Sequence, residues 1–310
     1  MSESARPSVS VLVSSYNYAA YVVEAIESAL AQCGSSDQVI VVDDGSSDGS
    51  PALLQRRFGQ EPRVRLIAQS NQGQLAAWMA GFVHATGDIV ALLDSDDLWE
   101  PDYLRSILAV YQTRPEIDFV YTNMQYFDQR QGPMNPSGPD RDMGLSMLLG
   151  AYVQRWQGTA TSAISLRRGL AARLLALPPD MAAQWKSRPD DCLVYGADIL
   201  GAHKFYLGTP LVRHRQHGAN AKNAYRNAAL QNYRHLVRSE RMLEFYRQQV
   251  EVTPQWMRMA KAEFRTKPSP RFAELRAYRW LLGQARLPWW KRIEQDLALW
   301  AHYFKGRRHR

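Results

Sequence analysis

The sequence predicts an α/β fold, a mostly parallel, doubly wound sheet, followed by a basic helical C-terminal appendage. Short apolar runs alternate with segments of helical periodicity as far as about Thr122, and two of these runs end in clustered carboxylates. Alternation of this kind is typical of parallel sheets, which bind ligands at the carboxyl ends of their strands. Residues 226–310 carry 19 Lys and Arg against 7 Asp and Glu, whereas residues 1–225 carry 19 against 23. We therefore expect a mildly acidic body and a basic appendage.

Apolar runs predict five strands, at Val9–Ser14, Gln38–Asp43, Val64–Ala68, Ile89–Asp94 and Phe119–Thr122. Apolar spacing or an opening proline predicts helices at Tyr21–Gln32, from Ser50, at Gln74–Ala85 and at Pro101–Tyr111. The alternation ends near Gln129, and the Gly-, Pro- and Asn-containing segment 131–142 is expected to be a loop. From Arg226 the pattern is helical, with interruptions at prolines.

Composition excludes several classes of protein. The 310 residues contain no run of 18 apolar residues and no apolar signal-peptide core near Met1, so no transmembrane helix is expected. Two cysteines, Cys33 and Cys192, make no disulfide framework and fit a cytoplasmic location. The first strand is not followed by Gly-x-Gly-x-x-Gly, and no Gly-Lys-Ser/Thr loop is present, which argues against a dinucleotide site and a P-loop ATPase.

Clustered acids follow the fourth predicted strand, in Asp94-Ser95-Asp96-Asp97. Carboxylates this close repel one another unless a proton or cation neutralises them, and Mg²⁺ or Mn²⁺ prefers oxygen ligands. Alternatively, Asp96 or Asp97 caps the helix that is expected to open near Pro101.

The first two strands also end in polar groups. Asp43 and Asp44 close the second strand, where a carboxylate can accept hydrogen bonds from a base or a ribose, although a simple strand-turn-helix junction explains part of the pattern. Ser15 and Tyr16 follow the first strand, and the Tyr16 ring is expected either to stack on a nucleobase or to cover the sheet edge.

In order and spacing, these motifs closely resemble the nucleotide-diphospho-sugar glycosyltransferases of family 2, which have the GT-A fold. The resemblance is dense over residues 8–115 and extends thinly to about Asn223. It implies a catalytic domain at residues 1–225, with a nucleotide-sugar half at about 8–128 and an acceptor half at about 129–225. Residues 226–310 then form a separate helical, basic, Trp-rich region.

The resemblance assigns donor-binding roles to individual residues. Ser15 and Tyr16 match positions that line the nucleobase pocket, and Asp44 matches the acid that contacts the uracil edge, with Asp43 beside it. Gln74 matches the start of the helix that flanks the donor. Uridine is the expected base, although thymidine and guanosine stay open.

Asp94-Ser95-Asp96 matches the family's Asp-x-Asp motif. Asp96 is then expected to bind the metal, Mn²⁺ or Mg²⁺, and Asp94 to contact ribose or metal, with Ser95 in the donor site. Many members carry Arg and Asn where this chain has Trp78 and Met79, a departure that removes one expected diphosphate contact.

The family's general base belongs to an acidic pair that opens a later helix. Asp190-Asp191 occupies that place, with the base carried over to Asp191 and Asp190 as its alternative. The same pair is also expected as an N-cap of a helix at Leu193–Leu200. Both roles are compatible, because a helix N-terminus keeps a carboxylate ionised.

A late segment, Arg213-His214-Arg215-Gln216-His217-Gly-Ala-Asn220, resembles the family's Tyr-Arg-x-His-x-x-Asn. Arg215 and His217 are expected to reach the pyrophosphate or the metal, with the alternative that His217 is a packed histidine.

The basic C-terminal region holds five of the nine tryptophans. Interfacial Trp with Lys and Arg suits a helix that lies on an anionic membrane, so peripheral attachment at the inner face of the membrane, near a lipid-linked acceptor, is one expectation. A helical appendage packed on the body is the other.

The main expectation is an inverting enzyme that uses a nucleotide-diphospho-sugar donor and a glycan or lipid-linked acceptor, in assembly of cell-surface polysaccharide, lipopolysaccharide or glycolipid. One alternative is a nucleotide-sugar-binding protein of the same fold that lacks transfer activity. A nucleic-acid-binding protein that uses the basic tail is another, which the ordered acidic motifs argue against.

Overall fold

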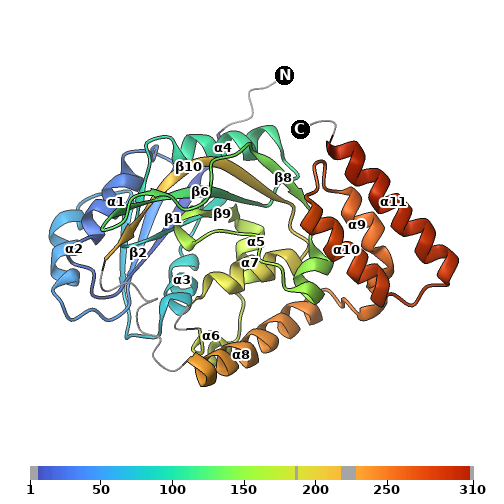
Figure 1. Ribbon diagram of the computed structural model, residues 1–310. Coiled ribbons are helices and arrows are strands. Elements are labelled where there is room, and N and C mark those ends of the chain that lie inside the picture. The colour runs from blue at the N-terminus through green and yellow to red at the C-terminus, as the bar shows by residue number, and fades with distance from the viewer. Residues whose placement is uncertain (1–5, 186–187, 218–227, 308–310) are drawn as a thin grey trace.

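In the computed structural model, which describes residues 6–185, 188–217 and 228–307, a central sheet organises the molecule (Figure 1). Its main path runs β3-β2-β1-β4-β9-β6-β10-β5, with β7 beside β6 and β8 beside β10. The described strands are β1 Val9–Ser15, β2 Gln38–Asp43, β3 Val64–Ala68, β4 Ile89–Asp94, β5 Leu98–Trp99, β6 Phe119–Asp128, β7 Gly132–Pro133, β8 Arg141–Gly144, β9 Ile164–Arg167 and β10 Lys204–Gln216.

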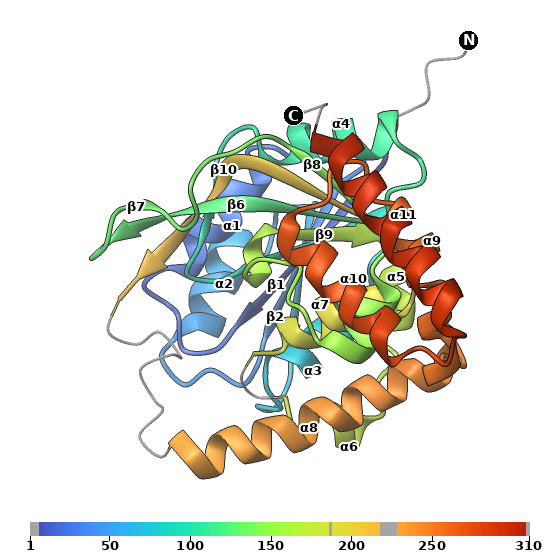
Figure 2. The same cartoon turned by 45° about the vertical axis from the view of Figure 1, so that its right-hand side comes forward.

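Helices cover both faces of the sheet, as a doubly wound fold requires (Figures 1 and 2). Alternate residues of β1 show the reason: Val11 and Val13 pack with α1, α2 and α4, whereas Leu12 packs on the other side with α3, α5 and α7. The helices are α1 Val22–Leu30, α2 Ser50–Phe58, α3 Gln74–Phe82, α4 Tyr103–Thr113, α5 Arg168–Leu174, α6 Pro179–Ala182, α7 Asp190–Ile199, α8 Ala228–Gln249, α9 Ala260–Arg265, α10 Phe272–Gln284 and α11 Trp289–Arg307.

The five strands predicted from apolar runs are all present, and β1 to β4 are parallel to one another. The second half of the sheet is mixed, because β9 runs antiparallel to both β4 and β6, whereas β10 is parallel to β6. The sequence analysis missed β10, which spans 13 residues and includes Pro210. Register shifts on both sides of Pro210 accommodate the proline in the sheet.

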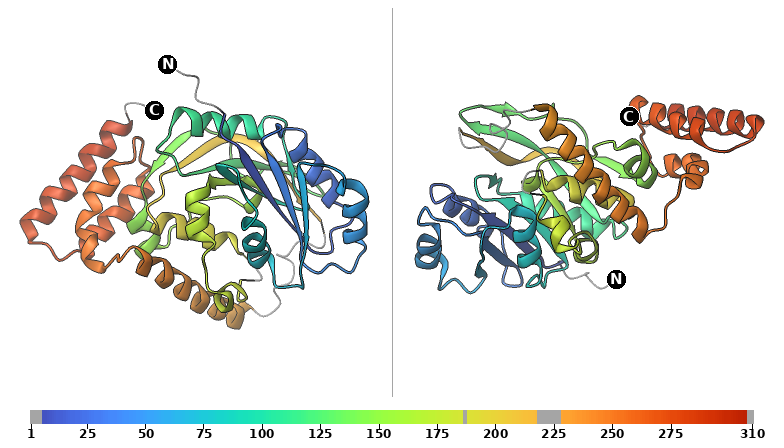
Figure 3. Two further views of the ribbon diagram at one scale, coloured as in Figure 1. Left: turned by 180° about the vertical axis from the view of Figure 1, so that it is seen from behind. Right: turned by 90° about the horizontal axis from the view of Figure 1, so that it is seen from below.

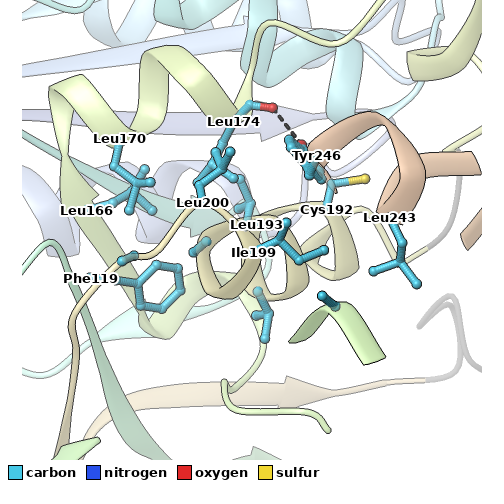
Figure 4. Close-up of a cluster of buried hydrophobic side chains, with 14 of the residues drawn as sticks. Phe119, Leu166, Leu170, Leu174, Cys192, Leu193, Ile199, Leu200, Leu243 and Tyr246 are labelled. Carbon is cyan, nitrogen blue, oxygen red and sulfur yellow. Dashed lines mark hydrogen bonds between the residues drawn. The ribbon is translucent and has the colours of Figure 1, made fainter. Parts of the chain in front are cut away.

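The C-terminal helices pack on the body and share its core. In the cluster drawn in Figure 4, Leu243 and Tyr246 of α8 meet Leu174 of α5 and Leu193 of α7, and the Tyr246 hydroxyl donates to the Leu174 carbonyl at 2.8 Å. Helices α9, α10 and α11 gather at one end of the molecule (Figures 1 and 3). The packed appendage, one of the two sequence-based expectations, is therefore present in the structure.

Within the described residues, no helix combines the length and the apolar character needed to cross a membrane.

Candidate active site

The carboxyl ends of β1, β2 and β4 meet at one edge of the sheet. Ser15 is paired in register with Asp43, and Ser14 is paired with Asp94. This edge therefore brings together the polar ends of three strands, as the sequence predicted.

Asp43 and Asp44 are both buried but have different partners. The Asp44 carboxylate accepts hydrogen bonds from Gln69 Nε2 at 2.7 Å, from the Gln72 N–H at 2.9 Å and from the Gly73 N–H at 2.7 Å. Asp43 Oδ2 accepts from the Ser46 N–H at 3.1 Å, and its Oδ1 is buried without a hydrogen-bond partner among the described residues. Asp43, rather than the predicted Asp44, thus holds the unused acceptor at this edge.

The predicted aromatic and hydroxyl groups lie beside Asp43. Ser15 is the last residue of β1 and pairs with Asp43, and its hydroxyl has no hydrogen-bond partner in the part of the chain that the structure covers. The Tyr16 side chain is 46% exposed, so its ring is available at the rim of the edge. Such an arrangement suits a planar ligand with N–H or O–H donors.

Asp94, Asp96 and Asp97 form the acidic cluster, with one oxygen of each within 4.8 Å of the others. The Asp97 carboxylate is already occupied by Ser162 Oγ at 2.6 Å, His214 Nδ1 at 2.9 Å and the Arg215 N–H at 3.0 Å. The alternative that Asp96 or Asp97 caps the next helix is wrong, because α4 starts only at Tyr103. Asp97 instead joins β10 to the loop that follows β4.

Burial and mutual repulsion disfavour ionisation of the remaining two acids. Burial, followed by the charges of Asp97 and Asp96, raises the pKa of Asp94 well above its usual value. Burial and Asp97 likewise raise the pKa of Asp96, although His217 Nε2, at 3.0 Å from Asp96 Oδ2, opposes the shift. A divalent cation would relieve this repulsion, and two carboxylates with an imidazole nearby are a donor set that fits Mn²⁺ or Mg²⁺.

Gln74 and Ser95 complete the loop around these acids. The Gln74 side chain, at the start of α3, donates to Asp94 Oδ1 at 2.5 Å and to Ser14 Oγ at 3.2 Å. Ser95 is buried in the turn between Asp94 and Asp96. Both predicted residues are thus at the acidic cluster.

His217 and Arg215 approach the cluster from the end of β10. The Tyr21 ring stacks on the His217 ring with 4.9 Å between the ring centroids. The Tyr18 ring contacts the same histidine edge-on, with a centroid distance of 5.8 Å. Arg215 Nε donates to the Asp96 carbonyl at 3.0 Å, and its Nη2 pairs with Glu24 at 2.6 Å. The described contacts of Arg215 therefore hold the cluster in place; Asn220, the end of the sequence motif, lies outside the described residues.

The two acids of α7 face different surroundings. They lie in the first helical turn, with Pro189 at the N-cap, so the predicted N-cap role is wrong. Asp191 is 1% exposed and accepts from Arg188 Nη2 at 3.0 Å, with His235 Nε2 of α8 at 3.4 Å. The charge of Asp190 contributes to the raised pKa of Asp94, which indicates that Asp190 lies near the acidic cluster.

Sequence reasoning missed several residues of the site. Burial and the charges of Asp96, Asp94 and Asp97 raise the pKa of Tyr18, which indicates that its hydroxyl lies near these acids. Tyr18 lies two residues after Tyr16, a position that the sequence analysis did assign to the site, so its place in the chain could have pointed to it. Nothing in the local sequence marks Ser162, whose hydroxyl contacts both Asp97 and the Asp94 N–H.

Comparison with known sequences gives a consistent result. The sequence model described as glycosyl transferase family 2 matches residues 10–168. An uncharacterized glycosyltransferase from Nostoc is 35% identical over 219 residues, which cover 68% of this chain and 66% of the relative. The succinoglycan biosynthesis protein ExoO of Rhizobium meliloti is 48% identical over 103 residues, and Escherichia coli chondroitin synthase is 35% identical over 132 residues. These matches cover 33% and 43% of this chain but only 29% and 19% of the respective relatives.

Solved structures show the same fold. Residues 1–349 of S. aureus TarS, in complex with UDP-GlcNAc, superpose with a TM-score of 0.57 and 16% identity, over 96% of this chain and 81% of the other. The Pyrobaculum calidifontis mannosyltransferase PcManGT, in complex with GDP-Man and Mn²⁺, gives a TM-score of 0.51 and 19% identity, over 98% and 88%. At these identities the likeness establishes the GT-A fold.

Proposed function

The chain belongs to glycosyl transferase family 2, and we propose that it is an inverting, metal-dependent enzyme that takes its sugar from a UDP-sugar. The observation that carries the proposal is the pair of acids formed by half-buried Asp94 and buried Asp96, at the sheet edge that also holds the unused oxygen of Asp43. Two structural neighbours were solved with UDP-GlcNAc and with GDP-Man and Mn²⁺, which supports a nucleotide-sugar donor. The acceptor hydroxyl is proposed to belong to a glycan or a lipid-linked sugar.

In this proposal, Asp96 and Asp94 hold the divalent cation, with His217 beside Asp96 as a further ligand or a positioning group. A bound cation neutralises negative charge on the diphosphate as it departs. Asp43 and Ser15 accept hydrogen bonds from the nucleoside, and Tyr16 packs on the base. Tyr18 and Tyr21 fix the His217 ring.

The general base is proposed to come from the acidic pair at the start of α7. The family resemblance favours Asp191, but its burial and its contacts with Arg188 and His235 favour a positioning role for it. Asp190 is half-buried, so its carboxylate is more accessible than that of Asp191, and we propose that it removes the acceptor proton. The α7 N-terminus favours the ionised form that a base requires.

Donor binding is tested by thermal shift and calorimetry with UDP-sugars, with and without Mn²⁺. Donor at about 100 times its Kd stabilises the folded state by about 2.7 kcal/mol. We expect Asp96→Asn to lose the Mn²⁺-dependent part of this stabilisation, whereas Asp180→Asn, an exposed acid on α6, keeps it. Equal Mn²⁺-dependent stabilisation of the two variants would contradict the metal assignment.

The base assignment is tested by transfer assays on two isosteric variants. Asp190→Asn is expected to lower kcat by a factor of about 10² to 10⁴ with donor affinity unchanged. Asp191→Asn is expected to lower the melting temperature and to affect kcat less. A stable Asp191→Asn variant without transfer activity would instead assign the base to Asp191, and donor binding by the wild type without any transfer would support the non-catalytic alternative.

We further propose that α11 lies on an anionic bilayer. Its exposed apolar side chains are Trp289 (75%), Trp290 (53%), Ile293 (53%), Leu297 (64%) and Phe304 (52%). Lys291, Arg292, Lys305 and Arg307 add positive charge to the same helix. Its two acids are neutralised, since Glu294 pairs with Lys261 at 3.4 Å and Asp296 with Arg279 at 2.6 Å. Apolar contact and attraction to anionic headgroups both favour this partner.

Vesicle flotation tests this surface. Vesicles that contain phosphatidylglycerol are expected to carry the full-length protein upward, and vesicles of phosphatidylcholine alone to carry less. Replacement of Trp289, Trp290 and Ile293 by Ser should abolish flotation. Replacement of Leu230, Tyr233 and Leu236 by Ser, at an exposed apolar face of α8, serves as the matched control. Loss of flotation only in the control would contradict the assignment to α11.

A further inference from the structure

A cavity lined by none of the three acids of the cluster lies elsewhere in the molecule. Its volume is about 530 Å³, and it is lined by side chains of β6, β8 and β10, by the segments 135–139 and 155–159, and by the start of α10. None of the acids assigned above to the metal or to the base belongs to its lining. A cavity of this size is in the range that accommodates small ligands, including a short oligosaccharide.

The lining of this cavity includes arginines that have no acidic partner among the described residues. Its one lining carboxylate, Glu274, pairs with Arg141 at 3.2 Å, accepts from the Arg271 N–H at 2.6 Å, and lies 3.9 Å from Lys267 Nζ. Arg155 and Arg271 also line the cavity, and neither has a carboxylate partner in the described parts of the chain. The cavity therefore favours an anionic ligand, because a guanidinium binds carboxylate or phosphate with paired, charge-assisted hydrogen bonds.

Aromatic rings form another part of the lining. Trp156 is half-buried, and its indole N–H donates to the Gly158 carbonyl at 3.0 Å, which fixes the ring. Tyr206 of β10 is also half-buried and lies 5.1 Å from the Tyr121 ring. Fixed, amphipathic rings provide flat apolar faces beside polar groups, a combination that suits a pyranose ring.

The cavity wall is joined to the helix that carries the proposed base. Trp156 contacts Tyr195 of α7 edge-on at 5.5 Å, and the charges of Asp191 and Asp190 contribute to the raised pKa of Tyr195, after burial. Lys204 Nζ donates to the carbonyls of Gln157 and Val194, at 3.2 Å and 2.8 Å, and so ties segment 155–159 to α7. Segment 155–159, which lines the cavity, is thus joined to the helix that begins with the acidic pair.

We infer that this cavity binds the acceptor glycan through an anionic group, either a uronate carboxylate or a phosphate, placed away from the hydroxyl that reacts. Arg155 and Arg271 bind the anion, and Trp156 and Tyr206 pack on the neighbouring sugar ring. The inference rests on the proposed transferase function and specifies the acceptor class as acidic saccharides.

Calorimetry with the full-length protein tests the inference with three probes. One is a hexasaccharide of alternating glucuronate and N-acetylglucosamine, the second is a glycerol phosphate trimer, and the third is the neutral maltohexaose. We expect one anionic probe to bind at least about tenfold more tightly than maltohexaose, and the probe that binds identifies carboxylate or phosphate as the anion. Arg155→Gln and Arg271→Gln are each expected to weaken that binding about tenfold, the loss of one charge-assisted contact.

The matched control is Arg56→Gln, which removes an exposed arginine on α2 and is expected to leave binding unchanged. Trp156→Leu should weaken every saccharide probe alike. The inference is overturned if neither anionic probe exceeds maltohexaose, or if all three arginine variants bind alike. Donor binding with Mn²⁺, measured on the same proteins, separates the two proposals: its absence from a wild type that binds the anionic probe refutes the donor assignment alone.

Discussion

Asp142 shows how much one carboxylate can contribute to stability. Burial opposes its ionisation, but hydrogen bonds from His203, Arg114 and the Gly144 N–H outweigh burial and hold its pKa at about 2, below the ordinary 3.8. Since the folded-state pKa is depressed, the stabilisation is complete above about pH 4 and is lost as the pH falls toward 2. We expect Asp142→Asn to lower the free energy of unfolding by about 2 kcal/mol at pH 7.

Urea unfolding at pH 7, 4, 3 and 2 checks this prediction. The difference between wild type and Asp142→Asn should shrink steadily below pH 4. Asp102→Asn removes an exposed acid that pairs with Arg105, and should cost less than about 1 kcal/mol at any pH. A constant difference for Asp142→Asn across this range would contradict the pKa argument.

The residue types at the site were predictable from the sequence, but the role of each individual residue was not. The sequence places Asp43 and Asp44, and likewise Asp96 and Asp97, after strands, and the family resemblance favours Asp44 for the nucleobase and Asp96 for the metal. In the structure, the Asp44 carboxylate accepts hydrogen bonds from Gln69 and from the backbone of residues 72–73. The Asp97 carboxylate is bound by Ser162, His214 and Arg215. Most of these partners come from distant parts of the chain, and no local pattern records them.

At the scale of elements, the turn after β2 and segment 69–73 form one unit. Gly45 has a φ of +79°, and a Cβ there would lie 2.8 Å from the Asn71 backbone nitrogen. Gly45→Ala is expected to cost about 1 to 2 kcal/mol for the left-handed backbone, with a further cost from the contact. Because Asp44 binds this segment, donor affinity should fall as well.

Gly49→Ala is the matched control for Gly45→Ala. Gly49 has a φ of +87°, but a Cβ there would meet nothing within 4 Å. The control therefore carries only the backbone cost, and denaturant unfolding combined with donor titration separates the two effects. Equal losses of stability and donor affinity in both variants would refute the contact with Asn71.

Strands could be predicted from the sequence where the sheet is buried on both faces. Strands β1, β2 and β4 are short apolar runs, because helices cover the sheet on both faces there. Strand β10 was missed, since its last four residues, Arg213–Gln216, are all polar and Pro210 is tolerated only through register shifts. Strands β5, β7, β8 and β9 have two to four residues each, too few for a periodic signal.

At the scale of the whole molecule, the basic region is bound to the body by buried charge as well as by apolar packing. Lys267 is 1% exposed and donates to the Met143 carbonyl and to Ser146 Oγ. Met143 lies in β8, and Ser146 follows shortly after that strand. Glu263 of α9 accepts from the Leu148 N–H at 2.9 Å. Net charge alone could not distinguish such internal cations from those that face a membrane, which is why the sequence left both expectations open.

Lys267→Met is therefore expected to destabilise the whole chain. The substitution keeps a similar apolar volume but leaves the Met143 carbonyl unpaired and takes from Glu274 a nearby cation, so a loss of about 3 to 5 kcal/mol is expected. Since the C-terminal helices share one apolar cluster with the sheet, denaturation followed by circular dichroism and by tryptophan fluorescence should give coincident transitions, both at lower urea. Lys261→Met, which breaks a more exposed pair with Glu294, should shift them by less than about 1 kcal/mol. Two separate transitions, of which Lys267→Met shifts only one, would mean that residues 228–307 unfold independently of the sheet.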